Sequence, residues 1–233
     1  TNFRADVPDW REALSWIKYS TPPFQSNGTP TVFAAWWDYG YWISVMGNRT
    51  SLADNATLST IRIAKLGRMF MSEEQESIEI LNDLKANYVV IYVVGQTFTL
   101  QENGQRIFIL GSSGDESKKQ WFIRIGGLDE NLFLEDDAFT PKPYFWENSL
   151  LGNMIPFSFV SFAEFSQGGL QFSNSTEYQS GLRSIYTYDM KYPADGPGPL
   201  RLAFMSSSLA EPKDGIFAAV IVYEIVDSQP EEP

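Results

Sequence analysis

The uninterrupted apolar run from Tyr88 to Val94 constrains the fold more than any other stretch of the sequence. A strand with one solvated face alternates apolar and polar residues, but this run shows no alternation, which is typical of a strand covered on both faces. Gly95 is predicted to end it. The segments before it have helical composition, and helices followed by a fully buried strand indicate an α/β fold.

Three helices are predicted ahead of this strand. The first opens at Asp6 and is closed by Pro22-Pro23, because proline cannot continue a helix. The second covers residues 56 to 70, whose Ala, Leu, Ile, Lys and Arg content favours helix. The third starts at Ser72-Glu-Glu-Gln75, which has the spacing of a capping box.

After residue 156 the sequence changes to short alternating runs of aromatic and β-branched residues, separated by clusters of Gly, Pro, Ser and Asn. This pattern is typical of an antiparallel β unit. The sequence therefore predicts a mixed α+β fold of the α/β class. Residues 1–156 are expected to form a helix-rich core with a buried sheet, and residues 157–233 a β-rich antiparallel peripheral part. The boundary between the two parts is approximate. The predicted strands of the second part are 157–165, 170–173, 183–190, 199–206 and 216–226.

The composition excludes several kinds of chemistry. The 233 residues include no Cys and no His, which removes thiol catalysis, Ser-His-Asp catalysis and the usual Cys/His zinc sites. The formal net charge of -12 argues against a nucleic acid partner, because phosphate binding needs clustered Lys and Arg. The apolar runs are shorter than the roughly 20 residues of a membrane helix, and no signal peptide pattern is visible, so a soluble chain is expected.

The WWDYG segment, Trp36-Trp37-Asp38-Tyr39-Gly40, follows a short apolar run predicted to be a buried strand. In a buried helix or strand Asp38 would be an unpaired charge, which is costly. In a turn at the strand exit it can accept hydrogen bonds beside two indole donors. The segment therefore predicts a recognition surface in which Tyr39 and Gly40 have structural roles, as a packed ring and a turn residue.

A second group of candidates lies between Gly114 and Gly127, which is predicted to be one short helix. At about 100° per residue, Asp115, Lys118, Phe122 and Ile125 fall within roughly an 80° arc. One face then carries an acid, a base and two apolar groups. An Asp–Lys pair three residues apart above a core stripe is the simpler structural account of the same pattern. The acidic pair Asp136-Asp137 is assigned to a solvated loop.

The order of these motifs resembles a known family. It resembles the C-terminal globular domain of oligosaccharyltransferase catalytic subunits of the archaeal type. The motifs that carry the resemblance are, in order, the WWDYG segment, Gly47-Asn-Arg-Thr50, Asp54-Asn-Ala-Thr57, an Ile-rich helix, Ser72-Glu-Glu-Gln75 and a valine strand. The family's second signature is Asp-x-x-Lys followed by Met or Ile. Asp115 and Lys118 match it, whereas Phe122 in the last place departs from it. The resemblance is dense from Asp9 to Ile125 and thin after residue 156.

The resemblance implies a function and a set of site residues. Enzymes of this family transfer a lipid-linked oligosaccharide to the Asn of an Asn-X-Ser/Thr sequon. Trp36, Trp37 and Asp38 are then expected to bind the Ser or Thr hydroxyl of the acceptor. Asp115, Lys118 and Phe122 are expected to border the same pocket, with Ile125 as a neighbour. No catalytic residue and no metal ligand is assigned to this chain.

The same resemblance implies partners that lie outside these 233 residues. A divalent metal (Mn or Mg) and the site for the lipid-linked oligosaccharide are expected in a multi-spanning membrane region, so the chain alone is expected to be inactive. Its own partner is the acceptor polypeptide, on the extracytoplasmic face of the cell membrane. The alternative is a non-enzymatic extracellular carbohydrate-binding or structural module whose exposed aromatic rings stack on sugars.

Overall fold

The computed structural model describes residues 8–166, 169–175, 178–179 and 181–226, and their strands form one nine-stranded sheet. The strands are β1 (Val32–Ala34), β2 (Thr50–Ser51), β3 (Tyr88–Thr99), β4 (Arg106–Leu110), β5 (Phe157–Ser166), β6 (Gly169–Phe172), β7 (Arg183–Tyr188), β8 (Leu200–Met205) and β9 (Gly215–Ile225). The order along the sheet is β2-β1-β3-β4-β7-β5-β6, while β9 pairs with β3 and β8. Only the β1–β2 and β1–β3 pairs are parallel in this described sheet.

Strand β3 is the centre of the sheet. One edge pairs along nearly its whole length with β9. The other edge pairs first with β1, at Tyr88 and Val89, and then with β4 from Gly95 onward. Its residues Val89, Val90 and Ile91 are fully buried, as expected for a strand covered on both faces.

The prediction that β3 ends at Gly95 is wrong, because the strand continues to Thr99. A Cβ at Gly95 would lie 2.5 Å from the carbonyl oxygen of Ile109 and 2.7 Å from the Phe217 ring. Glycine is therefore required here by the close approach of the neighbouring strands, and not by a turn.

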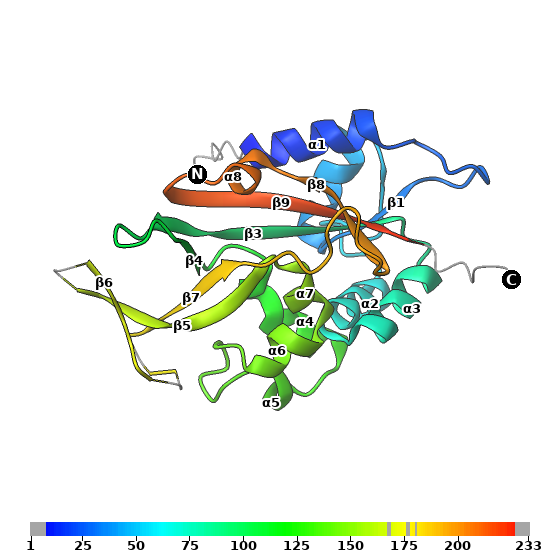
Figure 1. Ribbon diagram of the computed structural model, residues 1–233. Helices are drawn as coiled ribbons and strands as arrows, with labels where there is room; N and C mark the ends of the chain where they lie inside the picture. Colours follow the sequence, from blue (N-terminus) through cyan, green and yellow to red (C-terminus); the bar gives the residue numbers. More distant parts are fainter. Residues whose placement is uncertain (1–7, 167–168, 176–177, 180, 227–233) are drawn as a thin grey trace, which may run out of the picture.

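The helices are α1 (Pro8–Ser20), α2 (Thr60–Met71), α3 (Glu74–Asp83), α4 (Lys119–Gly126), α5 (Glu130–Phe133), α6 (Pro143–Asn148), α7 (Leu150–Met154) and α8 (Ser207–Ala210). The 3₁₀ turns η1 (Trp37–Tyr39) and η3 (Glu116–Lys118) and the π-helical turn η2 (Trp42–Met46) complete the set. Figure 1 shows α1 and α8 on one side of β3 and β9, and α2 to α7 on the other. Over the described residues, no helix is long and apolar enough to cross a lipid bilayer.

The three helices predicted ahead of β3 are present, although the predicted start of the first, at Asp6, lies outside the described residues, and the other two start differently. Helix α2 begins at Thr60, where the Ser59 side chain accepts a hydrogen bond from the backbone N–H of Arg62. The predicted capping box is wrong. Ser72 instead ends α2 through its backbone N–H, and α3 begins at Glu74 after Glu73, whose side chain makes no capping bond.

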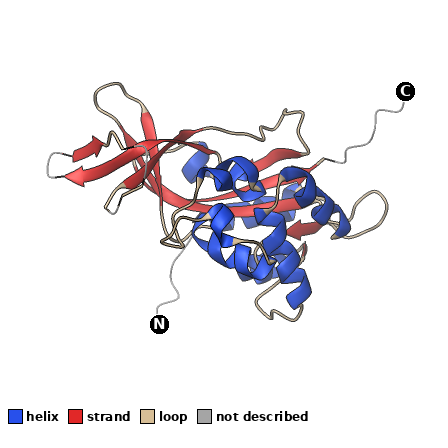
Figure 2. Ribbon diagram, turned by 90° about the horizontal axis from the view of Figure 1, so that it is seen from below, coloured by secondary structure: helices blue, strands red, loops and turns tan. Residues whose placement is uncertain are grey.

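The five strands predicted after residue 156 are all present, and each pairs antiparallel. The mixed α+β fold class is thus confirmed. Strands β7 and β9 pair with β4 and β3, so residues from both predicted parts share one sheet. The boundary near residue 156 stays a prediction. Figure 2 shows the helices gathered about one half of the sheet, while strands at the other end extend beyond them.

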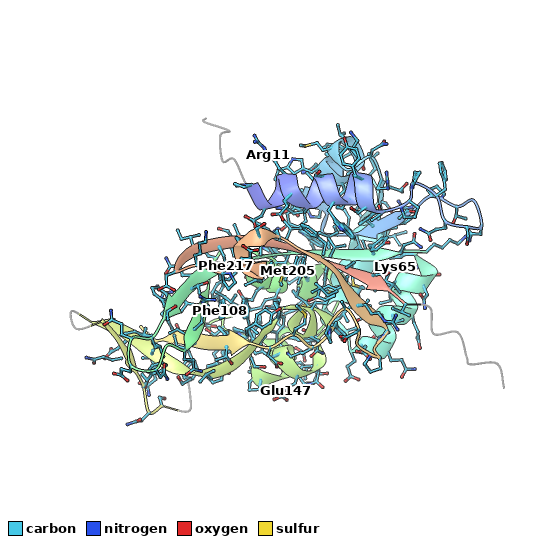
Figure 3. The ribbon with its side chains drawn as sticks, turned by 45° about the horizontal axis from the view of Figure 1, so that its top comes forward. Arg11, Lys65, Phe108, Glu147, Met205 and Phe217 are labelled. Atoms are coloured by element: carbon cyan, nitrogen blue, oxygen red, sulfur yellow. The ribbon has the colours of Figure 1, made fainter. Side chains whose placement is uncertain are left out.

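The interior joins the two halves of the chain through aromatic rings. Phe108 on β4 lies with its ring centroid 4.6 Å from that of Phe157 on β5 and 6.0 Å from that of Phe217 on β9. Phe108 and Phe217 are both buried, and Figure 3 labels them near one another. These contacts hold β4, which leads into the η3–α4 segment, in a fixed position.

Candidate functional site

The WWDYG segment leaves the carboxyl end of β1 and turns at once. Trp36 is 3% exposed, whereas Trp37 and Asp38, in the 3₁₀ turn η1, are partly exposed. Gly40 has helical dihedral angles, and a Cβ there would lie 2.0 Å from the carbonyl oxygen of Ala53. The glycine is therefore needed for close packing of two backbone segments and not for the bend that we expected.

Asp115 is attached to the main chain of β3. Its backbone N–H donates to the carbonyl oxygen of Tyr92 at 2.7 Å, and its carboxylate Oδ2 accepts from the Tyr92 N–H at 2.8 Å. The preceding Gly114 allows this approach, since a Cβ there would lie 2.9 Å from the same carbonyl oxygen. Because β1 is the parallel neighbour of β3, the sheet fixes Asp115 relative to the exit of the WWDYG segment.

Lys118 joins the two motifs. Its Nζ donates to Asp38 Oδ2 at 2.7 Å, to the Tyr39 hydroxyl at 2.6 Å and to Asp115 Oδ1 at 3.3 Å. The Tyr39 hydroxyl in turn donates to Asp115 Oδ1 at 2.7 Å. We call Asp38, Tyr39, Asp115 and Lys118 the site network. It joins residues that are 80 positions apart in the sequence.

Burial controls the electrostatics of this network. Asp115 is fully buried, and desolvation raises the pKa of its carboxyl, although the Lys118 charge and the Tyr92 and Tyr39 hydrogen bonds oppose the shift. Desolvation followed by the charges of Asp115 and Asp38 raises the pKa of Tyr39 well above its ordinary value. Tyr39 is therefore a neutral hydrogen-bond donor that orients a carboxylate and an ammonium group.

One oxygen of the network has no partner. Asp38 Oδ2 accepts from Lys118, but Oδ1 is covered and accepts no hydrogen bond from the described residues. A buried acceptor without a donor costs about 1–3 kcal/mol. A ligand that donates an O–H or N–H group to this oxygen would remove that cost.

Phe122 forms the apolar wall behind the tryptophans. It is fully buried, and its ring meets Trp36 edge to face at 4.5 Å and stacks on Phe70 of α2 at 5.0 Å. Helix α4 reaches this position because Gly67 and Gly126 let the backbones of α2 and α4 come into contact. A ring in the last place of the Asp-x-x-Lys signature is thus accommodated as a packing partner of Trp36.

The predicted single helix from Asp115 is wrong, because η3 comes first and α4 begins only at Lys119. The reason is local: Asp115 is bonded to β3, and the first turn is tightened to connect it to α4. Ile125 is 38% exposed, unlike the fully buried Phe122, so the expected common face does not extend to it. The structure therefore brings together Trp36, Trp37, Asp38, Asp115, Lys118 and Phe122, and leaves Ile125 at the surface. The binding role of these seven residues stays a prediction.

The sequence interpretation missed Tyr39. A tyrosine in an aromatic segment gives no sign of which group its hydroxyl will meet, and here that group is 76 residues away.

A metal site would have to draw on the acidic side chains, since the chain has no Cys and no His. In the described part of the chain no three His, Cys, Asp or Glu side chains are grouped as a metal site would require.

Comparisons with known proteins find relatives that share part of this chain. The chain is 39% identical over 124 residues to dolichyl-diphosphooligosaccharide–protein glycosyltransferase subunit STT3B of Oryza sativa subsp. japonica, covering 53% of this chain and 15% of that protein. It is 31% identical over 174 residues to subunit STT3 of Saccharomyces cerevisiae, covering 70% of this chain and 21% of that protein. The chain thus spans less than a quarter of either relative.

A solved structure is also similar in fold. It is the oligosaccharyltransferase AglB of Archaeoglobus fulgidus, with a TM-score of 0.44 and 16% sequence identity, covering 85% of this chain and 23% of that one. No protein-family model matches the chain. Over the segments that the two sequence comparisons align, this chain is similar to the STT3 subunits of dolichyl-diphosphooligosaccharide–protein glycosyltransferases.

Proposed function

We propose that this chain recognises the acceptor sequon for a membrane oligosaccharyltransferase, which transfers a lipid-linked oligosaccharide to the Asn of Asn-X-Ser/Thr. The observation that carries the proposal is the 2.7 Å bond between Lys118 Nζ and Asp38 Oδ2, which joins the WWDYG segment to the Asp-x-x-Lys motif. The names of the STT3 relatives support it and favour it over a carbohydrate-binding or structural module.

In this proposal the sequon hydroxyl is the group that the site reads. A Ser or Thr hydroxyl donates one hydrogen bond and can accept up to two. It donates to Asp38 and accepts from the indole N–H groups of Trp36 and Trp37. Lys118 holds the Asp38 carboxylate in place, and Asp115 and Tyr39 hold Lys118. A site built for a hydroxyl rejects an analogue without one, because its buried polar groups are then left unpaired.

The apolar wall has a complementary role. Phe122 packs against Trp36 and borders the place where a threonine methyl would lie. Holding the residue two places after the acceptor Asn fixes the Asn amide relative to the reacting groups, which accelerates transfer by positioning.

The chemistry of transfer is proposed to lie outside these residues. A divalent metal, Mn or Mg, and the lipid-linked oligosaccharide bind to a multi-spanning membrane region of the whole enzyme, and this chain faces the extracytoplasmic side. The chain by itself supplies binding and is expected to be inactive as a transferase.

The test is peptide binding by the 233-residue chain. A tethered Asn-Ala-Thr peptide placed near Trp37 should crosslink in preference to Asn-Ala-Val, which has the same shape but no hydroxyl. Asp38→Ala should remove the preference, and in the whole enzyme it should abolish glycopeptide formation. The matched control is Asp195→Ala, at an exposed acid far along the chain.

Circular dichroism should show that Asp38→Ala leaves the chain folded, because Asp38 is partly exposed and Asp115 still pairs with Lys118. Equal capture of the Thr and Val peptides by the wild-type chain would refute the proposal. Normal glycopeptide formation by the Asp38→Ala enzyme would refute it as well.

A further inference from the structure

A large groove lies away from the site network, between the sheet and the α5–α6 region. Its volume is about 1140 Å³. Five of the rings that line it are Trp146, Phe157, Phe159, Phe162 and Tyr186. We call it the aromatic groove. Neither the WWDYG segment nor the Asp-x-x-Lys motif contributes a residue to it, so the proposed function leaves it unexplained.

A β-bulge creates the aromatic floor. Phe159 lies directly opposite Tyr186 in the β5–β7 pair, and the register then shifts by one residue, with Val160 as the extra one. Without that shift Phe162, three residues after Phe159, would point to the opposite face of the strand. With it, Phe159 and Phe162 share a face, and their ring centroids are 4.9 Å apart.

The floor is continuous and partly open to solvent. The Phe159 ring lies 6.1 Å from Tyr186, which lies 5.1 Å from Trp146 of α6. Phe159 is 45% exposed although it stands in a row of packed rings. An exposed apolar row with a polar rim is typical of an interaction surface, because burying it against a partner gains free energy.

The rim of the groove is mainly negatively charged. Four lining residues are acidic, Glu135, Asp136 and Asp137 before α6 and Glu147 on it, against the single ammonium of Lys191. Lys191 Nζ donates to the carbonyl oxygens of Trp146 and Gly152, both at 3.3 Å, so its charge is directed into the protein. Figure 3 shows Glu147 at the outer margin of the molecule. Exposed carboxylates facing aromatic rings are complementary to a cation that also carries apolar surface.

We propose that the aromatic groove binds a basic segment of a partner polypeptide, with Arg or Lys side chains at the acidic rim and apolar side chains on the Phe159–Tyr186–Trp146 floor. Arginine is favoured because its planar guanidinium stacks on rings and pairs with carboxylates. The groove is separate from the site network, because none of the network residues lines it. Binding at the groove therefore does not depend on sequon recognition.

The experiment uses a fluorescein-labelled 12-residue peptide of repeating Arg-Leu-Gly, which contains no sequon, and measures its fluorescence anisotropy with the 233-residue chain. The comparison peptide has Gln in place of every Arg. The basic peptide should bind at least about tenfold more tightly, and added salt should weaken it. Equal binding of the two peptides would overturn the proposal.

Variants of the chain localise the binding. Asp136→Asn with Glu147→Gln should weaken the basic peptide about fivefold, as expected for two partly screened charges. Phe159→Ala should weaken it by a similar factor through the lost ring contacts. Glu102→Gln with Glu211→Gln, two exposed acids elsewhere, makes the same change of net charge and should change affinity less than about twofold.

Two further measurements distinguish basic-peptide binding from sequon binding and from sugar binding. Asp38→Ala should leave the affinity for the basic peptide unchanged, so failure of sequon binding would not affect the result. Displacement of the basic peptide by a neutral oligosaccharide such as cellopentaose would show a sugar site and would overturn the proposal. So would an Asp136→Asn/Glu147→Gln chain that binds as the wild type does.

Discussion

Two acid–lysine pairs with the same spacing lie one residue apart and have different surroundings. In Asp115-x-x-Lys118 the lysine side chain is 20% exposed and reaches across to Asp38 at 2.7 Å. In Glu116-x-x-Lys119 the lysine side chain is 1% exposed, pairs with Glu116 at 2.8 Å and lies 4.5 Å from the centre of the Phe139 ring. The first pair joins two motifs at a partly open site, and the second is enclosed.

The difference shows that i,i+3 spacing alone does not identify a functional pair. Successive residues in η3 and α4 point about 100–120° apart, so neighbouring pairs face different environments. The hydrogen bonds that attach Asp115 to β3 turn Lys118 toward the WWDYG segment and leave Lys119 for the interior. The variants below test whether the inner pair serves stability and the outer pair serves recognition.

The largest effect is expected for Lys119→Met. The change leaves Glu116 charged and buried without its partner, which should lower the free energy of unfolding by about 3–5 kcal/mol. Urea denaturation measures it. The fraction that remains folded should still prefer the Asn-Ala-Thr peptide. A decrease in the free energy of unfolding of less than about 1 kcal/mol would show that the Glu116–Lys119 pair is not enclosed as described.

The double change Glu116→Leu with Lys119→Met should recover most of that loss, to within about 1 kcal/mol of the wild-type chain, because two apolar groups of similar size replace a buried ion pair without leaving a charge. The same denaturation measurement applies. A double variant as unstable as the single one would mean that Lys119 stabilises the protein through its other contacts, which include the Glu116 carbonyl oxygen at 3.3 Å and the Phe139 ring.

Lys118→Met should lower the free energy of unfolding less than Lys119→Met does, and it should impair peptide recognition more. The Asp115 carboxylate keeps its bonds from Tyr39 and Tyr92, so the unfolding free energy should fall by only about 2 kcal/mol. Asp38 loses its ion-pair partner, so preference for the Thr over the Val peptide should disappear in the crosslinking assay. A variant with wild-type preference would separate Lys118 from the recognition role.

The pH dependence of stability distinguishes Asp115 from an ordinary surface acid. Burial raises its folded-state pKa above 3.8, so between the unfolded and folded pKa values the native state binds more protons than the unfolded state. Its contribution to stability is then present below the unfolded pKa and is lost as pH rises through the folded pKa.

Asp115→Asn has no such group. The unfolding free energy of the wild-type chain minus that of Asp115→Asn should therefore decrease as pH rises from about 3 to about 7. Denaturation at a series of pH values measures this difference. A difference that stays flat or increases with pH would show that Lys118 dominates over burial.

The smallest effect is expected where an ion pair is solvated. Arg68 and Glu76 are bonded at 2.6 Å, but their side chains are 46% and 43% exposed. Arg68→Gln should change the unfolding free energy by no more than about 0.5 kcal/mol, since exposed pairs contribute little. This variant sets the lower reference against which the Lys118 and Lys119 results are compared.

The sequence predicted features that depend on local pattern. The unbroken apolar run gave β3, and the alternation after residue 156 gave β5 to β9 with bounds close to those observed. The meeting of Asp38 with Lys118 was also expected, but only through resemblance to a family, because no periodicity connects residues 80 positions apart.

Other features depend on tertiary contacts that have no local signal. Gly40 and Gly95 resemble turn residues in the sequence, yet each is required by the approach of a distant backbone. Tyr39 resembles a packing residue, yet its hydroxyl lies between Asp115 and Lys118. The capping box at Ser72 failed because α2 uses that residue for its own end.

The pairing of β9 with β3 has a consequence for how the protein is made. Strand β3 is synthesised well before residues 215–225, which cover one of its edges. At about 5–20 residues per second, that edge waits several seconds without its partner. Contacts of such high sequence separation slow folding, and an unpaired apolar strand is prone to associate with other chains. Truncation before β9 should therefore yield an aggregating nascent chain and not a smaller folded unit.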